Sequence, residues 1–185
     1  MQSAYKVAVL VGSLRKESIS RKVAHALEGV SPERLKLEIA EIGDLPFYNP
    51  DLEENVPPAW AAFRQKIAAS DAVIFVTPEY NRSVPGVLKN AIDVGSRPYG
   101  KSAWAGKPAG VVSVSPGALA AFGANHHLRQ SLVFLDMPAM QQPEAYIGNA
   151  AALFDDKGHL ANESTTAFLR MFMTSFESWI DRVRD

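Results

Sequence analysis

Short apolar runs alternate with amphipathic segments along the chain. Residues 6–12, 71–77 and 108–115 are mostly apolar and rich in Val and Ala, a pattern typical of strands buried on both faces. Residues 35–42 place apolar side chains at every second position, so we expect a half-exposed strand there. A fifth, weaker strand is expected within residues 137–147.

Between these strands, apolar side chains recur at helical spacing. The spacing predicts helices over residues 20–30, 58–70, 85–94, 118–135 and 161–184. The last helix carries one large apolar stripe, which we expect to be core or a subunit contact rather than a cofactor site. The stripe consists of Phe168, Phe172, Phe176, Trp179, Ile180 and Val183.

Five strands that alternate with five helices indicate an α/β fold with a doubly wound parallel sheet. Right-handed crossovers place helices on both faces and give a three-layer sandwich. In such sheets ligands bind beyond the carboxyl ends of the strands, where the strand order reverses. The loops that begin at Gly12, Pro78 and Ser115 are therefore the candidates for a functional site.

Composition narrows the function further. A length of 185 residues predicts one domain, residues 1–185. Twenty Asp and Glu balance the nineteen Lys and Arg, so the chain has no excess positive charge to attract nucleic acid or an anionic membrane. The absence of cysteine excludes disulfides, cysteine-bound metals and a catalytic thiol. Apolar runs of five residues, such as Val7–Val11, are far shorter than a membrane span of ~20 residues. The first residues do not resemble a signal peptide, so we expect a soluble cytoplasmic protein.

The first candidate loop, residues 12–21, is suited to an anion. It joins a buried strand to a helix N-terminus, where free N–H groups and the helix dipole favour negative charge. Ser13, Ser18 and Ser20 add hydroxyl groups, and Arg15 adds a planar cation suited to phosphate oxygens. The alternative is an ordinary capped helix with Ser18 or Ser20 as its cap.

The other two loops are suited to a flat polar ring. Two prolines and a glycine stiffen residues 78–86, in which Tyr80 offers a stacking surface and Asn81 a paired donor and acceptor. The alternative is a rigid turn whose tyrosine only covers the sheet end. The third loop, residues 115–117, consists of small residues that permit close approach of a ligand.

Three motifs resemble the NADPH-dependent FMN reductase family, and its quinone and chromate reductase branch most closely. They are Gly-Ser-Leu-Arg-x-x-Ser-x-Ser at 12–20, Pro-Glu-Tyr-Asn-x-Ser-x-Pro-Gly-x-Leu-Lys-Asn-Ala-Ile-Asp at 78–93, and Ser-x-Gly at 115–117. The resemblance implies a flavodoxin-like fold that binds FMN, with strand order 2-1-3-4-5. It also implies an NAD(P)H-dependent reductase of quinones or other small oxidants such as chromate, in which the flavin carries the chemistry and no side chain is catalytic.

The resemblance assigns roles to residues of all three motifs. Ser13, Arg15, Ser18 and Ser20 would bind the FMN phosphate, and Ser115 would lie near the far edge of the ring. The residues that would border the ribityl chain and the isoalloxazine ring are Pro78, Glu79, Tyr80 and Asn81. Ser83 and Gly117, which belong to the same motifs, complete the expected cofactor set.

Two positions depart from the pattern of the family. Many relatives have asparagine at the position of Ser20, and many have paired glycines where this chain has Ala120 and Ala121. Serine at position 20 still offers a side-chain oxygen, but its side chain is shorter than that of asparagine and reaches less far toward a ligand. The two extra methyl groups would narrow the opening over the ring, and with it the range of substrates.

Other motifs do not support a different function. Residues 95–102 match the Walker A pattern and residues 132–136 resemble Walker B, but the first is expected to follow a helix rather than a strand. His126 and His127 are adjacent, so on a helix they point about 100° apart and do not favour a shared metal. We expect no metal site. Without a Gly-x-Gly-x-x-Gly loop, NAD(P)H would visit the flavin only transiently.

A flavodoxin-type electron carrier, without a substrate of its own, is the rival hypothesis. Such a carrier is usually strongly acidic, and a net charge of −1 does not favour it. The resemblance also implies a homo-oligomer, a dimer or a tetramer. Trp60, Phe122, Phe134 and Phe154 supply more aromatic surface than a small monomer is expected to bury, and so support the oligomer.

Overall fold

A single parallel sheet forms the centre of the computed structural model, which describes residues 4–184. Its strands are β1 (Tyr5–Val11), β2 (Leu35–Ile39), β3 (Ala72–Thr77), β4 (Ala109–Val114) and β5 (Ala145–Ile147). They are hydrogen-bonded in the order β2-β1-β3-β4-β5, and each pair is parallel. This order confirms the prediction, as does the complete burial of β3 and β4 in the middle of the sheet.

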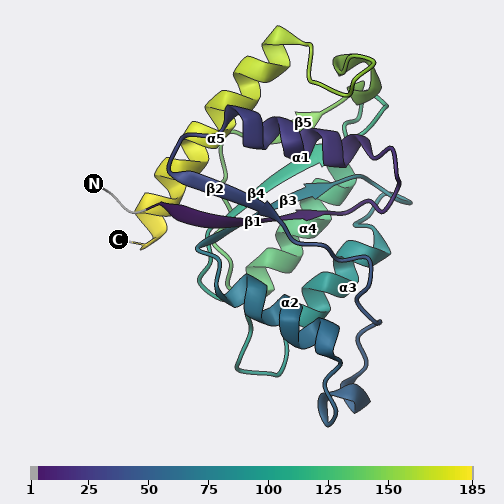
Figure 1. Ribbon diagram of the computed structural model, residues 1–185, viewed down its shortest axis with the longest axis vertical. Coiled ribbons are helices and arrows are strands. Elements are labelled where there is room, and N and C mark those ends of the chain that lie inside the picture. Colours follow the sequence, from purple (N-terminus) through teal and green to yellow (C-terminus); the bar gives the residue numbers. More distant parts are fainter. Residues whose placement is uncertain (1–3, 185) are drawn as a thin grey trace.

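Helices cover both faces of the sheet (Figure 1). Helices α1 (Ile19–Val30) and α5 (Glu163–Arg184) lie on one face, and α2 (Pro58–Ala68), α3 (Gly86–Gly95) and α4 (Phe122–Phe134) lie on the other. Two short 3₁₀ helices, η1 (Pro50–Glu53) and η2 (Ala150–Leu153), interrupt the loops. None of the helices in residues 4–184 is long and apolar enough to cross a membrane.

Two apolar cores result, one on each face. The predicted stripe of α5 lies in the first core, where Phe172 and Phe176 are fully buried and pack closely over Gly110 of β4. The second core contains Trp60 and Trp104. Trp60 is completely buried and donates its indole N–H to the carbonyl oxygen of Pro46 at 2.9 Å. The expectation that Trp60 contributes exposed aromatic surface is therefore wrong.

The helix predicted over residues 118–135 begins four residues later than expected. Residues 118–121 belong to a loop instead, in which Ala120 and Ala121 adopt left-handed backbone with φ of 52° and 57°. Alanine favours a helix by intrinsic propensity, but the contacts of this loop override that preference. The Walker-like residues 95–102 come after α3, and no helix follows before β4, so the context of a phosphate-binding loop is missing.

Candidate cofactor site at the carboxyl ends of three strands

A cavity of about 250 Å³ lies beyond the carboxyl ends of β1, β3 and β4. All three candidate loops contribute to it, so the structure brings together most of the residues that the sequence predicts. Its lining consists of Ser13, Arg15, Ser18, Ile19, Ser20, Pro78, Glu79, Tyr80, Val114, Ser115 and Pro116. Ile19, Val114 and Pro116 were not predicted, because an apolar side chain next to a motif carries no chemical signal of its own.

The first loop turns sharply from β1 into α1. A Cβ atom at Gly12 would lie 3.1 Å from the Pro78 side chain and 3.2 Å from the Leu88 side chain, so a larger residue would have to push one of them aside. The Ser18 side chain caps α1 by accepting a hydrogen bond from the N–H of Arg21 at 3.1 Å. The N–H groups of Ile19 and Ser20 have no acceptor within residues 4–184, as expected at a helix N-terminus.

Three polar side chains of this loop remain available to a ligand. Ser13 and Ser20 are buried, and neither hydroxyl has a hydrogen-bond partner in the described part of the chain. Arg15 is exposed at the rim and forms no ion pair with any described residue, whereas Arg21 holds Glu41 through two hydrogen bonds of 2.7 and 2.8 Å. The Arg21 guanidinium thereby lowers the pKa of Glu41. Ser13 and Ser20 both line the cavity, so their hydroxyls are accessible to a ligand bound there.

The second loop contains a tight hairpin turn, as in the alternative of a rigid turn, but its type was not predicted. The backbones of Tyr80 and Ser83 exchange two hydrogen bonds, of 3.0 and 3.1 Å, around two residues with positive φ. These are Asn81, at 51°, and Arg82, at 63°, so the turn is of type I′. Tyr80 remains about half exposed beside the cavity.

Helix α4 holds this turn from both ends. Glu79 keeps only 12% of its side chain exposed, and its Oε2 accepts a hydrogen bond from the N–H of Ala124 at 3.0 Å. On the other side, Ser83 Oγ lies 3.0 Å from Nδ1 of His127. His127 is therefore tied to the turn, a role that its sequence position alone does not reveal.

The third loop is short and closed on itself. Ser115 Oγ accepts a hydrogen bond from the N–H of Gly117 at 3.0 Å, and Ser115 and Pro116 face the cavity. Three residues of the expected set do not line this cavity. Asn81 and Gly117 lie next to residues that do, and the Ser83 side chain is turned toward His127.

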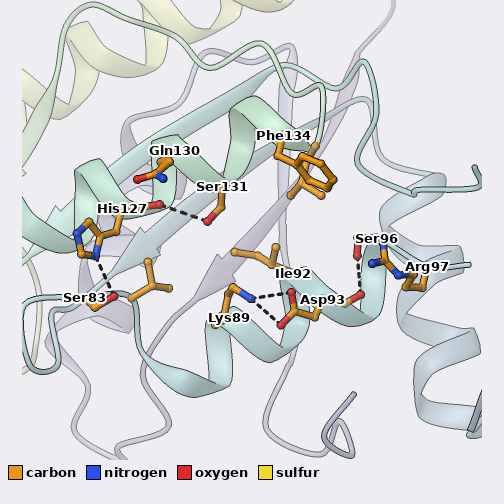
Figure 2. A pocket seen from close by; sticks show the side chains of 12 residues that line it. Ser83, Lys89, Ile92, Asp93, Ser96, Arg97, His127, Gln130, Ser131 and Phe134 are labelled. Carbon is orange, nitrogen blue, oxygen red and sulfur yellow. Dashed lines mark hydrogen bonds and ion pairs between the residues drawn. The ribbon is translucent and has the colours of Figure 1, made fainter. Parts of the chain in front are cut away.

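A second, larger hollow of about 500 Å³ lies between α3 and α4 (Figure 2). Lys89 and Asp93 of α3 form an ion pair on one side of it, and Phe134 of α4 borders the other side. Apart from Ser83, it contains none of the expected cofactor residues. Its position along two helix surfaces differs from the strand ends, where ligands of such sheets bind.

The smaller cavity suits a ligand with one anionic end and one flat end. A helix N-terminus, two unpartnered hydroxyls and an unpaired arginine gather at its first loop, which fits a terminal phosphate. Tyr80 and the small residues Ser115 and Pro116 border the opposite part, which fits a planar ring. These residues therefore fit FMN, whose phosphate and ring lie at opposite ends of the molecule.

Comparisons with known proteins agree with this geometry. The family model described as NADPH-dependent FMN reductase matches residues 5–152. A quinone reductase of Pseudomonas putida is 67% identical over 181 residues, which cover 97% of each chain. A 2-hydroxy-1,4-benzoquinone reductase of a Burkholderia species is 43% identical and covers 96% of this chain and 97% of its own. The structure of FerB, a flavoenzyme NAD(P)H:(acceptor) oxidoreductase of Paracoccus denitrificans, superposes with a TM-score of 0.91 at 42% identity, over 97% of this chain and 98% of that one.

Proposed function

The chain belongs to the NADPH-dependent FMN reductase family and is an NAD(P)H-dependent oxidoreductase with FMN as its cofactor, and from this premise we propose that it reduces quinones at the cavity beyond β1, β3 and β4. The observation that carries this proposal is the pair of unpartnered hydroxyls of Ser13 and Ser20, which line the cavity beside the N-terminus of α1. When bound there, FMN would supply the hydride chemistry that links NAD(P)H to a two-electron acceptor.

The first loop binds the phosphate of FMN in this proposal. The Ser13 and Ser20 hydroxyls and the N–H groups of Ile19 and Ser20 would donate to phosphate oxygens. Ser18 would also donate its O–H proton, because the helix cap uses only its oxygen, as an acceptor. Arg15 closes the rim with a charged, bidentate hydrogen bond. Without a ligand, these donors have no acceptor among the described residues. Phosphate binding would therefore supply their hydrogen-bond acceptors with little rearrangement of the loop.

The second and third loops orient the ring. Pro78, Glu79, Tyr80 and Asn81 border the ribityl chain and one edge of the ring, and Ser115 with Gly117 lies at the far edge. The type I′ turn fixes the backbone of Asn81, so its position depends little on ligand binding. Tyr80, about half exposed, shapes the approach of a substrate to the open face.

NAD(P)H and the acceptor use that open face in turn. The chain has no Gly-x-Gly-x-x-Gly loop that would bind a dinucleotide permanently. NAD(P)⁺ therefore leaves before the oxidant binds, which gives ping-pong kinetics. The relatives support a quinone as the acceptor, because two of them are named as a quinone reductase and a 2-hydroxy-1,4-benzoquinone reductase. Chromate is a second acceptor to be tested.

A rate measurement separates this function from an electron carrier of the flavodoxin type. The purified protein is mixed with NADPH, with and without 1,4-benzoquinone, and absorbance at 340 nm is followed. A reductase oxidises many equivalents of NADPH per chain only while quinone is present. A carrier without its own substrate would consume no more than one equivalent, and that result would overturn the proposal.

We further propose that the protein assembles into a dimer or tetramer through the surface of α3 and α4. Phe134 is 77% exposed and Val133 is 80% exposed at the end of α4, next to the larger hollow, where Phe134 borders open space (Figure 2). Exposed apolar side chains that gather beside a hollow are typical of protein interfaces. Phe122 is also exposed, whereas Phe154 packs against the core and supports the oligomer less.

Light scattering tests the assembly. At micromolar concentration the wild-type chain should have a mass of at least twice 20.1 kDa, and Phe134→Glu should reduce it toward 20.1 kDa. Phe47→Glu is the matched control, because Phe47 is 80% exposed but lies in the loop between β2 and α2. A wild-type mass of 20.1 kDa would refute the proposal.

We also propose a cytoplasmic location. The chain contains no cysteine and so uses no disulfide, which is consistent with a reducing compartment. Its reductant NAD(P)H is supplied there. Fractionation of cells that express the protein tests this, and recovery in another fraction would contradict it.

A further inference from the structure

A buried chain of hydrogen bonds connects α4 to the loop that follows β4. Nε of Arg129 donates to Oδ1 of Asn125 at 2.9 Å, and Nδ2 of Asn125 donates to Oγ of Ser113 at 3.2 Å. The Ser113 hydroxyl in turn donates to the carbonyl oxygen of Ala120 at 2.8 Å. Ser113 and Asn125 are completely buried, so no water competes for these bonds.

The chain ends in a strained piece of backbone. Ala120 and Ala121 are consecutive, buried and left-handed, with φ of 52° and 57°. Side chains with a Cβ atom rarely adopt this conformation, and they keep it only where the surroundings hold it firmly. Gly148 packs beneath the loop, and a Cβ atom there would lie 3.2 Å from the carbonyl oxygens of Gly117 and Ala118.

Packing alone does not explain the two polar side chains. The other buried residues of α4, Ala124, Leu128 and Leu132, are apolar. An apolar side chain at 125 would fill the same space without losing hydration, whereas a buried amide is costly unless its bonds fix a particular geometry. The geometry that is fixed here is the position of the Ala120 carbonyl.

We propose that Asn125 and Ser113 are positioning residues for FMN. Their hydrogen bonds hold the left-handed backbone at Ala120 and Ala121. They thereby keep residues 115–121 in the conformation that places Ser115 and Pro116 at the cavity. This inference rests on the proposed FMN site. It also explains how two alanines keep a left-handed backbone: the hydrogen bond from Ser113 to the Ala120 carbonyl compensates for the strain. Glycine adopts the left-handed conformation freely and would not need this bond.

Four variants test this in the full chain. Asn125→Ala and the smaller change Ser113→Ala break the hydrogen-bond chain, and each is also made together with Ala120→Gly and Ala121→Gly. The matched control is Asn90→Ala. Asn90 is likewise a buried asparagine on a helix, but it holds the loop at Leu45, Pro46 and Tyr48, outside the cavity.

Three readouts are compared: the FMN dissociation constant of the apoprotein, KM and kcat for 1,4-benzoquinone, and amide hydrogen exchange of residues 120–122. We expect Asn125→Ala or Ser113→Ala to weaken FMN binding about 5- to 20-fold, the range set by the loss of one buried hydrogen bond. KM should rise more than kcat falls, and exchange at 120–122 should accelerate. The two glycines should restore FMN binding to within about twofold of wild type, as expected when the strain is gone.

Asn90→Ala should lower the melting temperature without changing FMN binding. If Asn125→Ala and Ser113→Ala behave like Asn90→Ala, or if the glycines restore nothing, the two residues are only structural and the inference is wrong. If Asn125→Ala does not fold, the same three measurements on Ser113→Ala test the inference. A wild-type chain that binds no FMN would overturn the proposed function instead, while hydrogen exchange would still report on whether the loop is held.

Discussion

The carboxylate of Glu79 accepts a hydrogen bond from the backbone N–H of Ala124 at 3.0 Å, and it thereby joins the turn after β3 to the first turn of α4. A Cβ atom at Gly123 would lie 3.0 Å from Oε2 of Glu79 and 2.9 Å from the carbonyl oxygen of Arg82, so glycine is required for this approach. The turn that carries Tyr80 and Asn81 is thus fixed to a helix rather than held by its own residues alone.

Replacement of Glu79 by alanine should therefore destabilise the fold. The N–H of Ala124 would lose its partner in a largely buried place, at a cost of about 1–3 kcal/mol. For a chain of this size that lowers the melting temperature by about 2–4 °C per kcal/mol. Glu41→Ala, which removes a 66% exposed carboxylate from an ion pair with Arg21, should cost less than about 1 kcal/mol. Equal melting temperatures for the two variants would contradict this role of Glu79.

Arg15→Ala should weaken FMN binding about 10- to 100-fold, because a charged hydrogen bond contributes about 1.5–3 kcal/mol. Titration of apoprotein with FMN measures this. Arg21→Ala is the matched control, since the Arg21 side chain is held by Glu41 and should not contribute to binding. An unchanged dissociation constant for Arg15→Ala would remove this residue from the site.

Arg82→Gly should stabilise the protein by about 1 kcal/mol, because glycine adopts positive φ without the steric cost that arginine has there. The ion pair with Glu79 that is lost involves a 74% exposed arginine and contributes little. Arg82→Ala loses the same ion pair but keeps a Cβ atom, so it should bring no gain. Thermal unfolding of the wild type and the two variants measures these differences in stability. An equal gain in stability from both variants would show that backbone strain is not the cause.

Stability should fall in acid through Asp181. Hydrogen bonds from Arg34, of 2.8 and 3.1 Å, and from the Tyr5 hydroxyl lower the pKa of this carboxyl. The folded state therefore favours the ionised form, so its stabilisation is complete above the ordinary pKa of about 3.9 and is lost as pH falls through the lowered value. Denaturant unfolding of wild type and Asp181→Asn at pH 6 and pH 3 should show a difference in the free energy of unfolding that narrows at pH 3. A constant difference would contradict this.

Initial rates with NADPH and 1,4-benzoquinone should give parallel double-reciprocal lines, because both substrates use one face in turn. Tyr80→Ala should change the KM for quinone more than it changes FMN occupancy, since Tyr80 lies half exposed at the opening. Intersecting lines would mean that both substrates bind together, and a large loss of FMN with unchanged KM would assign Tyr80 to the cofactor instead.

The sequence predicts the fold better than it predicts the loops. Alternating patterns suffice for the elements and for a doubly wound parallel sheet, because buried parallel strands and amphipathic helices have distinct periods. The strand order followed from the family resemblance. The left-handed backbone of Ala120 and Ala121 is not predictable in this way, since it depends on tertiary contacts with Ser113 in β4 and with Gly148 after β5. The type of the turn at Asn81 and Arg82 was missed because arginine is not typical of type I′ turns.

The same limit applies to single side chains at the site. The motifs place Ser13, Tyr80 and Ser115 at the cavity, because their loops follow the three neighbouring strands β1, β3 and β4. The hydrogen bonds between Glu79 and Ala124 and between Ser83 and His127 depend on where α4 begins. The sequence pattern predicted that start four residues too early. Trp60 was counted among the aromatic residues that a monomer would not bury, and only its packing against Tyr48 and Arg64 shows that it is covered.

The rate of NADPH oxidation at saturating 1,4-benzoquinone, measured while FMN is added stepwise to apoprotein, tests the central claim most directly. The account predicts no turnover without FMN, a linear rise, and a sharp plateau at one FMN per chain, with the plateau reached only at higher FMN concentration for Arg15→Ala. Turnover that does not depend on FMN, or FMN binding without turnover, would contradict it.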